Sequence, residues 1–351
     1  MKSIKIGNIE VGGKAPIRIN CNIGCNDMLG YAEEIEKIKT IKLSGSVPDM
    51  MMDLSLIKVE RPLYKVIIDE LGKPVGTVLS YIPFSKERGL DWEECKTYLL
   101  DLCKSGISFV TIHFTANERL LKLAKRDRLM VCTSRGGGLC LYDIHKNQKS
   151  QNLFYEHIDE IAEIVKTYDV AVSLGVTFRP ATIFDACDEV HIEETKEQLR
   201  VCQYLQSLGV KVLVENIGHI SINKLETHTR LLQQFDAPIM PLGPMPTDNA
   251  INEDHVSAAI GAAFSAYWGV ANVINCVTRY EHSHANINID ALLEAIRTMR
   301  IVAHSIDVAR GNENALRLDR KIADERCNQK SCIIGGGNCN RCSTVCPLKI
   351  V

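Results

Sequence analysis

The sequence lacks the features that would place a protein in a membrane or on a nucleic acid. It has no run of eighteen or more apolar residues and no leader that combines basic, apolar and small residues. The formal net charge is only -2 and the isoelectric point is about 6.6, whereas nucleic-acid-binding surfaces are strongly basic. We therefore expect a soluble, cytoplasmic protein that binds neither a membrane nor a nucleic acid, and whose ligand is a small molecule.

A dinucleotide-binding turn is also missing, since no stretch resembles GxGxxG. Short apolar or β-branched runs recur instead between amphipathic stretches such as WEECKTYLLDLCKSG. There are eight runs: MMMDLS, PVGTVLS, SFVTIHF, LMVCTS, VAVSLGV, VKVLVENI, APIMPLGP and VANVINCVT. This alternation predicts a parallel sheet covered by helices, and eight units favour a closed (β/α)8 TIM-like barrel over an open sheet.

The pattern divides the chain into three parts. Residues 1–48 contain a short strand and a helix through YAEEIEKIKTIK, and we expect them to form a short N-terminal cap. Residues 49–310 form the predicted catalytic barrel. Residues 311–351 form a charged linker helix followed by a cysteine-rich tail.

Catalytic groups in such barrels project from the C-terminal ends of the strands. Taken one at a time, many polar residues at these positions could be helix caps or hydroxyl groups at the surface. Those roles do not explain why arginine, histidine and glutamate all occur around the same rim. Each predicted strand is followed by at least one polar residue: Asp53, Ser55, Tyr81, His113, Ser134, Arg135, Arg179, Glu215, His219, Asp248, Glu281 and His282. We expect the active site at this rim.

The stretch TSRGGG follows a predicted strand directly. Its glycine N–H groups could approach an anion closely, and Arg135 adds a positive charge. This favours a phosphate site, which Arg179 could assist, although a flexible turn is the alternative.

Two histidines follow strands that we expect to be neighbours. His219 ends ENIGH and His282 lies in YEHSH, each with a carboxylate nearby. Histidines on adjacent rims can share a divalent metal, zinc or iron, and His284 is the weaker alternative ligand.

Fourteen cysteines are many for a chain expected in a reducing compartment. Most of the nine upstream cysteines lie in apolar patterns and behave as small hydrophobes. Cys339, Cys342 and Cys346 instead form C-x2-C-x3-C in a short glycine-rich tail. Three thiolates can hold three irons of a [4Fe–4S] cluster, or most of a zinc site with Cys327 or Cys332 as fourth ligand. The spacing leaves both open.

These motifs together resemble the ThiC family of phosphomethylpyrimidine synthases. The chain carries RINCNIGCN, MMDLS, TIHF, TSRGGG, SLGVTFRP, VENIGH, PLGPMPTDNAINEDHVSAAIGAA, VTRYEHSH and the three-cysteine tail in the family's order. The resemblance implies a non-classical radical S-adenosylmethionine carbon-carbon lyase that rearranges 5-aminoimidazole ribotide to 4-amino-5-hydroxymethyl-2-methylpyrimidine phosphate for thiamin biosynthesis. A paralogous branch makes 5-hydroxybenzimidazole, a cobamide lower ligand.

The resemblance also assigns roles to residues of this chain. Cys339, Cys342 and Cys346 would hold the [4Fe–4S] cluster, and His219 and His282 a second metal. Substrate contacts would come from Asn20, Asn22, Met52, Tyr81, His113, Ser134, Arg135, Gly136, Arg179 and Glu215. The tail would reach a neighbouring subunit's barrel in a homodimer, or a heterodimer with a paralogue, and a flavodoxin- or ferredoxin-type protein would donate electrons.

Three departures from the family pattern bear on the product. Val176 replaces an acidic residue of GDGLRPG, EGPGH has become ENIGH, and the cysteine motif is one residue shorter than C-x2-C-x4-C. We also expect the chain to lack the N-terminal domain that is usual in the family. We therefore place a 5-hydroxybenzimidazole-type product ahead of the pyrimidine phosphate. The rival hypotheses are a zinc-dependent barrel lyase or hydrolase, and an inactive partner subunit.

Overall fold

The computed structural model describes residues 2–335, 339 and 341–350. The chain divides into two compact units, residues 1–303 and 304–351. None of the helices in these described residues combines the length and apolar character that crossing a bilayer requires.

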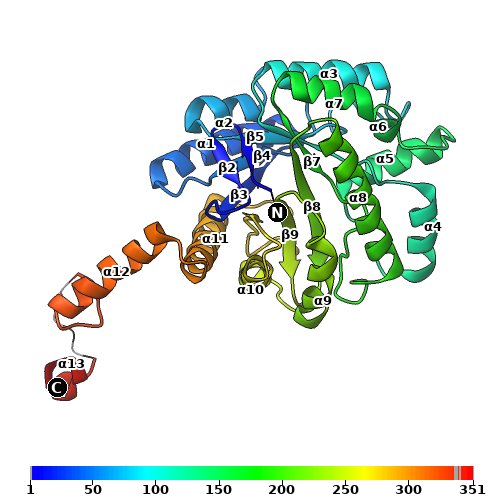
Figure 1. Cartoon of the computed structure of the whole chain (residues 1–351). Helices are drawn as coiled ribbons and strands as arrows, with labels where there is room; N and C mark the ends of the chain where they lie inside the picture. The colour runs from blue at the N-terminus through cyan, green and yellow to red at the C-terminus, as the bar shows by residue number, and fades with distance from the viewer. Residues whose placement is uncertain (1, 336–338, 340, 351) are drawn as a thin grey trace. The chain divides into compact units, whose positions relative to one another are not determined.

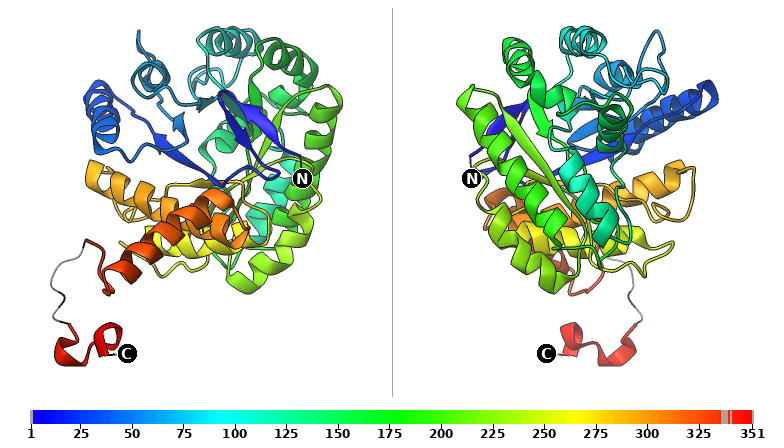
Figure 2. Two further views of the ribbon diagram at one scale, coloured as in Figure 1. Left: turned by 60° about the vertical axis from the view of Figure 1, so that its left-hand side comes forward. Right: turned by 90° about the vertical axis from the view of Figure 1, so that its right-hand side faces the viewer.

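The first unit is an eight-stranded parallel barrel surrounded by helices (Figures 1 and 2). The strand order is β10-β3-β4-β5-β6-β7-β8-β9. The strands are β3 (Arg18–Ile23), β4 (Met50–Asp53), β5 (Val75–Val78), β6 (Phe109–Ile112), β7 (Ala171–Leu174), β8 (Val212–His219), β9 (Ile239–Met245) and β10 (Val273–Asn275). The predicted TIM-like barrel is confirmed.

Helices follow the strands in alternation. They are α1 (Met28–Ser44), α2 (Leu63–Leu71), α3 (Trp92–Lys104), α4 (Glu118–Asp127), α5 (Arg135–Lys146), α6 (Leu153–Glu156), α7 (Ile158–Thr167), α8 (Glu189–Ser207), α9 (Ile222–Leu232), α10 (Asp254–Tyr267) and α11 (Ile289–Ala309). The second unit contains the end of α11, α12 (Glu313–Asn328), a 3-10 turn η1 (Ser343–Val345) and α13 (Pro347–Ile350).

Two assignments made from the sequence were wrong. Residues 18–23, expected in the cap, form barrel strand β3 between β10 and β4. The run LMVCTS forms no strand, and β6 pairs directly with β7. Leu129 and Met130 are exposed, and their N–H groups bond the carboxylate of Asp185. A short apolar run therefore reads like a strand although it lies in a loop.

The barrel closes between β9 and β10 through asparagine side chains. Pro241 of β9 has no N–H to donate across this seam. The N–H of Ile239 donates to Asn272 Oδ1 at 3.0 Å, and Asn275 Nδ2 donates to the carbonyl of Pro241 at 2.9 Å. These bonds replace part of the backbone ladder.

An N-terminal hairpin covers one end of the barrel core (Figure 2). It consists of β1 (Ile4–Ile6) and β2 (Ile9–Val11). Ile6 and Val11 are fully buried in one cluster with Phe109, and the hairpin glycines contact residues that precede barrel strands. The opposite, C-terminal ends of the strands are left for the polar residues described below.

A substitution at Gly76 of β5 tests how closely this core is packed. A Cβ there would lie 2.3 Å from the buried ring of Phe109. We expect Gly76→Ala to lower the free energy of unfolding by about 1–3 kcal/mol because the core must shift. Gly138→Ala in α5, where a Cβ meets nothing within 4 Å, is the control and should be neutral or stabilising. Urea unfolding followed by circular dichroism measures both, and equal midpoints would contradict the packing.

Candidate active site at the strand ends

The structure places most of the predicted rim residues at the C-terminal ends of the barrel strands. Asn20 bonds Asn22 at 2.8 Å and Asn275 at 2.7 Å, which links β3 to β10. Met52 belongs to the core cluster against which Tyr81 packs, and Arg135 lies 5.4 Å over the ring of Tyr81. All ten residues to which the resemblance assigns substrate contacts are in this unit.

Glu215 is a buried carboxyl inside the barrel. Thr111 of β6 and Ser173 of β7 both donate to its Oε1 at 2.7 Å. Burial raises the pKa of Glu215, and the two hydroxyls and the charge of Arg179 oppose this rise. No described residue donates to Oε2, so this oxygen is left for a ligand.

His113 is held as a neutral imidazole. Its ring lies between Gly136 and Gly175, where an added Cβ would fall 2.3 and 2.7 Å from ring atoms. Nε2 shares a 2.9 Å hydrogen bond with the hydroxyl of Ser134, whereas Nδ1 is buried without a partner. Burial, aided by Arg179, lowers the pKa of His113 to about 3.

The TSRGGG stretch is the start of a helix and not a flexible turn. Ser134 is the N-cap of α5, and its Oγ accepts from the N–H of Gly137 at 3.2 Å. The positive end of the helix dipole therefore points to this rim. Neither Arg135 nor Arg179 forms an ion pair with a carboxylate in the described part of the chain. The unpaired guanidinium groups and the helix end together favour an anion.

A hollow of about 340 Å³ lies beside these residues. It is lined by Arg135 of α5, by the loop after β3 and by Thr278 and Glu281 after β10. Its lining also includes the carboxylates of Glu33 and Glu34 of α1.

His219 and His282 face each other although their strands are not neighbours. The sheet order places β9 between β8 and β10, so the expected strand adjacency was wrong, but the loop after β10 brings His282 back. The two Nε2 atoms are 3.3 Å apart. Asp248 Oδ1 bonds His219 Nδ1 at 2.7 Å, and Asp254 Oδ1 bonds His282 Nδ1 at 3.0 Å.

This geometry suits a shared metal. If both Nδ1 atoms are protonated and donate to the carboxylates, both Nε2 atoms carry lone pairs that face each other. Two facing lone pairs repel each other unless a cation lies between them. Two nitrogens at about 2.0–2.1 Å from a tetrahedral metal are about 3.3–3.4 Å apart, which matches the observed separation. Carboxylates that orient ligating histidines are the usual outer shell of such sites. His284 bonds its neighbour Ser283 instead.

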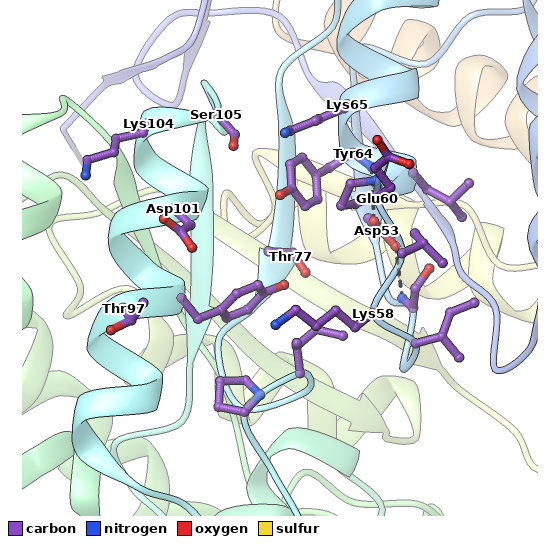
Figure 3. A pocket seen from close by; sticks show the side chains of 18 of the residues that line it. Asp53, Lys58, Glu60, Tyr64, Lys65, Thr77, Thr97, Asp101, Lys104 and Ser105 are labelled. Atoms are coloured by element: carbon purple, nitrogen blue, oxygen red, sulfur yellow. Dashed lines mark hydrogen bonds between the residues drawn. The ribbon is translucent and has the colours of Figure 1, made fainter.

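Two predicted rim residues, Asp53 and Ser55, line a different pocket. This pocket of about 820 Å³ lies between α2 and α3, on the outside of the sheet (Figure 3). Asp53 accepts from the N–H groups of Ser55 at 2.9 Å and Tyr64 at 3.0 Å, and therefore has a local capping role.

The tail cysteines differ from the upstream ones in exposure. All fourteen cysteines are free thiols, and seven of the upstream nine are buried. Cys342 is exposed, and Cys339 and Cys346 are partly exposed. Cys327 and Cys332 are exposed as well, while residues 336–338 and 340 of the motif region lie outside the described residues. Accessible thiols at this spacing fit a bound cluster or metal better than a core.

One further set of potential ligands was not anticipated. Among the described residues, only Cys187, His191 and His228 bring three such atoms within 4.8 Å. The two imidazole rings stack at 4.1 Å and share Asn216 Oδ1 as a partner. Both Nε2 atoms are thus directed at an amide oxygen, and His191 Nδ1 accepts from the N–H of Cys187 at 3.2 Å, so these ring nitrogens already have hydrogen-bond partners. We interpret this set as a core network.

Sequence reasoning also missed residues that support the site. Thr111 and Ser173 bond Glu215, Asp254 bonds His282, and Asn275 bonds Asn20. Thr111 is two positions before His113, and the period-two alternation of a strand could have placed it on the inner face. Asp254 begins a helix and gave no comparable signal.

Comparison with known proteins gives relatives along almost the whole chain. A model described as the radical SAM ThiC family matches residues 2–332. The phosphomethylpyrimidine synthase of Carboxydothermus hydrogenoformans is 33% identical over 327 residues, which cover 90% of this chain and 75% of that protein. The synthase of the same name from Thermotoga petrophila is 34% identical over 328 residues, which cover 91% and 76%.

The burial of His113 predicts a pH effect on stability. An unfolded histidine has a pKa near 6.5, so below that pH the unfolded chain takes up a proton that the folded chain refuses. His113 should therefore lower the free energy of unfolding as the pH falls from about 6.5 toward 3, by at most about 1.4 kcal/mol per unit. Urea unfolding of His113→Gln at pH 7, 6 and 5 should show a shallower dependence than the parent, and parallel curves would contradict a neutral, buried imidazole.

Proposed function

Because the chain belongs to the radical SAM ThiC family, we propose that it rearranges 5-aminoimidazole ribotide, or a close ribotide, to a cofactor precursor. Membership implies a [4Fe–4S] cluster and S-adenosylmethionine as cofactors. The observation that carries the substrate class is the pair of unpaired guanidinium groups, Arg135 and Arg179, beside the N-terminus of α5. The phosphate of a ligand could bind both guanidinium groups and the N–H groups at the start of α5.

Different residues at the C-terminal ends of the strands would bind different parts of the ribotide. Arg135, Arg179 and the N–H groups at the start of α5 would hold the phosphate. Neutral His113 would donate from Nδ1, since Nε2 is occupied by Ser134, and Glu215 would accept a hydroxyl at Oε2. Asn20, Asn22, Met52 and Tyr81 would enclose the ring. These contacts would orient the ligand for the reaction.

Cys339, Cys342 and Cys346 would hold the cluster, because they are accessible thiols with the spacing for three irons. When bound, such a cluster supplies one electron that cleaves S-adenosylmethionine to methionine and a 5'-deoxyadenosyl radical, which takes a hydrogen atom from the ribose. We propose a homodimer in which the tail serves the partner's barrel, a flavodoxin- or ferredoxin-type donor, and a cytoplasmic location.

For the product we propose a 5-hydroxybenzimidazole-type compound. Val176 is fully buried in the loop that carries Arg179, so no carboxylate stands there to take part in the pyrimidine-forming reaction. The pyrimidine phosphate of thiamin biosynthesis is the second candidate, which the names of the relatives favour. Incubation of the reconstituted protein with dithionite, S-adenosylmethionine and aminoimidazole ribotide, followed by mass spectrometry, distinguishes the two. Absence of 5'-deoxyadenosine would exclude both.

The cluster assignment predicts a spectroscopic loss. After anaerobic reconstitution with iron and sulfide, Cys342→Ala should lose the visible absorption of the cluster, because two thiolates do not retain it. Cys187→Ser, which changes a partly buried upstream thiol, is the matched control and should keep the spectrum. An unaltered spectrum in Cys342→Ala would refute the assignment, and zinc without acid-labile sulfide would favour a zinc-dependent hydrolase or lyase.

The histidine pair predicts a second metal. His282→Ala should abolish stoichiometric zinc or iron binding outside the cluster, and Asp254→Asn should weaken it by about 10–100-fold because the imidazole loses its orienting carboxylate. His284→Ala should bind normally. Elemental analysis and competition with a chelator measure these affinities, and equal metal content in His282→Ala would exclude the site.

A further inference from the structure

Two buried ionic side chains hold the loop that carries Arg179. Glu194 of α8 accepts from the N–H of Thr177 through Oε1 and from the N–H of Phe178 through Oε2, both at 2.6 Å. On the other side of the same peptide segment, Arg128 donates from Nη1 to the carbonyl of Phe178. Both polar groups of the residue before Arg179 are therefore fixed by buried side chains, and the charge of Arg128 strengthens the bond that it makes.

Arg128 is itself fixed. Its side chain is fully buried, and Nε and Nη2 bond the two carboxylate oxygens of Asp188 at 2.7 and 2.9 Å. Asp188 is also the N-cap of α8, where it accepts from the N–H of His191 at 2.7 Å. The bidentate pair leaves the guanidinium one orientation, with Nη1 directed at the loop.

Glu194 also joins this loop to the one that follows β6. Its Oε1 accepts from Thr115 Oγ1 at 2.7 Å, and Thr115 lies two residues after His113. Burial raises the pKa of Glu194 to about 7, while the three hydrogen bonds and Arg128 oppose this rise. Burying a carboxyl lowers the stability of the fold. The position of Glu194 between the loops after β6 and β7 therefore suggests that it has a role in the site.

We infer that Glu194 and Arg128 are positioning residues for Arg179, and that they fix this arginine relative to His113 before a ligand binds. Neither residue has been assigned a contact with the ligand. The consequence for ribotide affinity rests on the proposed function, whereas the fixing of the loop does not. A preorganised arginine binds an anion without a further cost of ordering the loop.

Glu194→Gln is the test, because the amide keeps the size of the side chain. Its oxygen can still accept from Thr115 and Thr177, but its NH2 group would face the N–H of Phe178, two donors with no acceptor. Amide exchange at Phe178, followed by mass spectrometry of peptides covering 175–180, should accelerate by about tenfold or more. Glu193→Gln on the exposed side of α8 is the matched control and should exchange like the parent.

Affinity for aminoimidazole ribotide, measured by calorimetry, tests the consequence. Glu194→Gln should weaken binding by about tenfold, as expected for the loss of one hydrogen bond to a charged group. In an Arg179→Ala background the same change should have no further effect, because nothing remains to be positioned. Independent, additive losses would overturn the positioning role, since a merely structural defect does not depend on Arg179.

The outcomes separate this inference from the proposed function. If the parent binds no ribotide, the proposed function fails, and the exchange experiment still decides whether the loop is held. Unchanged exchange in Glu194→Gln would overturn the inference even if the ribotide binds. Should E194Q fail to fold, R128K removes the bond to the Phe178 carbonyl and the bidentate pair while keeping the charge, and the same two measurements apply.

Discussion

A polar group buried without a partner costs about 1–3 kcal/mol, and this cost governs the arrangement at the carboxyl ends of the strands. Thr111 and Ser173 satisfy one oxygen of Glu215, and Asn275 satisfies the amide of Asn20. Among the described residues, six buried side-chain atoms have no hydrogen-bond partner, and two of them, Asn20 Oδ1 and His113 Nδ1, belong to residues that we propose as substrate contacts. A bound ligand would satisfy these two atoms.

The proposed phosphate site combines three sources of positive potential. Arg135, Arg179 and the N-terminus of α5 provide positive potential at one side, where no carboxylate neutralises the arginines in the described residues. The hollow beside Arg135 is also lined by Glu281, and the next residue in the chain, His282, belongs to the histidine pair.

The sequence allowed the barrel and most of its rim to be predicted, because inward-facing residues follow strands in a regular order. It failed where local signals are ambiguous. LMVCTS has the composition of a strand, but Asp185 holds its first N–H groups in a loop. The strand at 18–23 joins the barrel through β4 and through β10, and β10 lies some 250 positions away in the chain, beyond the reach of any local pattern. Glu194 was missed since a glutamate in an amphipathic helix normally faces solvent.

The fixed loop after β7 also bears on the difference between this chain and the synthases that it resembles. Glu194 and Arg128 hold the backbone at Thr177 and Phe178, so the position of Arg179 depends little on the side chain at 176. Val176 is fully buried, and a carboxylate there would need partners that an apolar residue does not. Replacement of an acid by valine on such a backbone alters the charge available to the reacting ligand while leaving the arginine in place. The product that we propose would then differ from the pyrimidine phosphate without a change in the residues proposed to hold the phosphate.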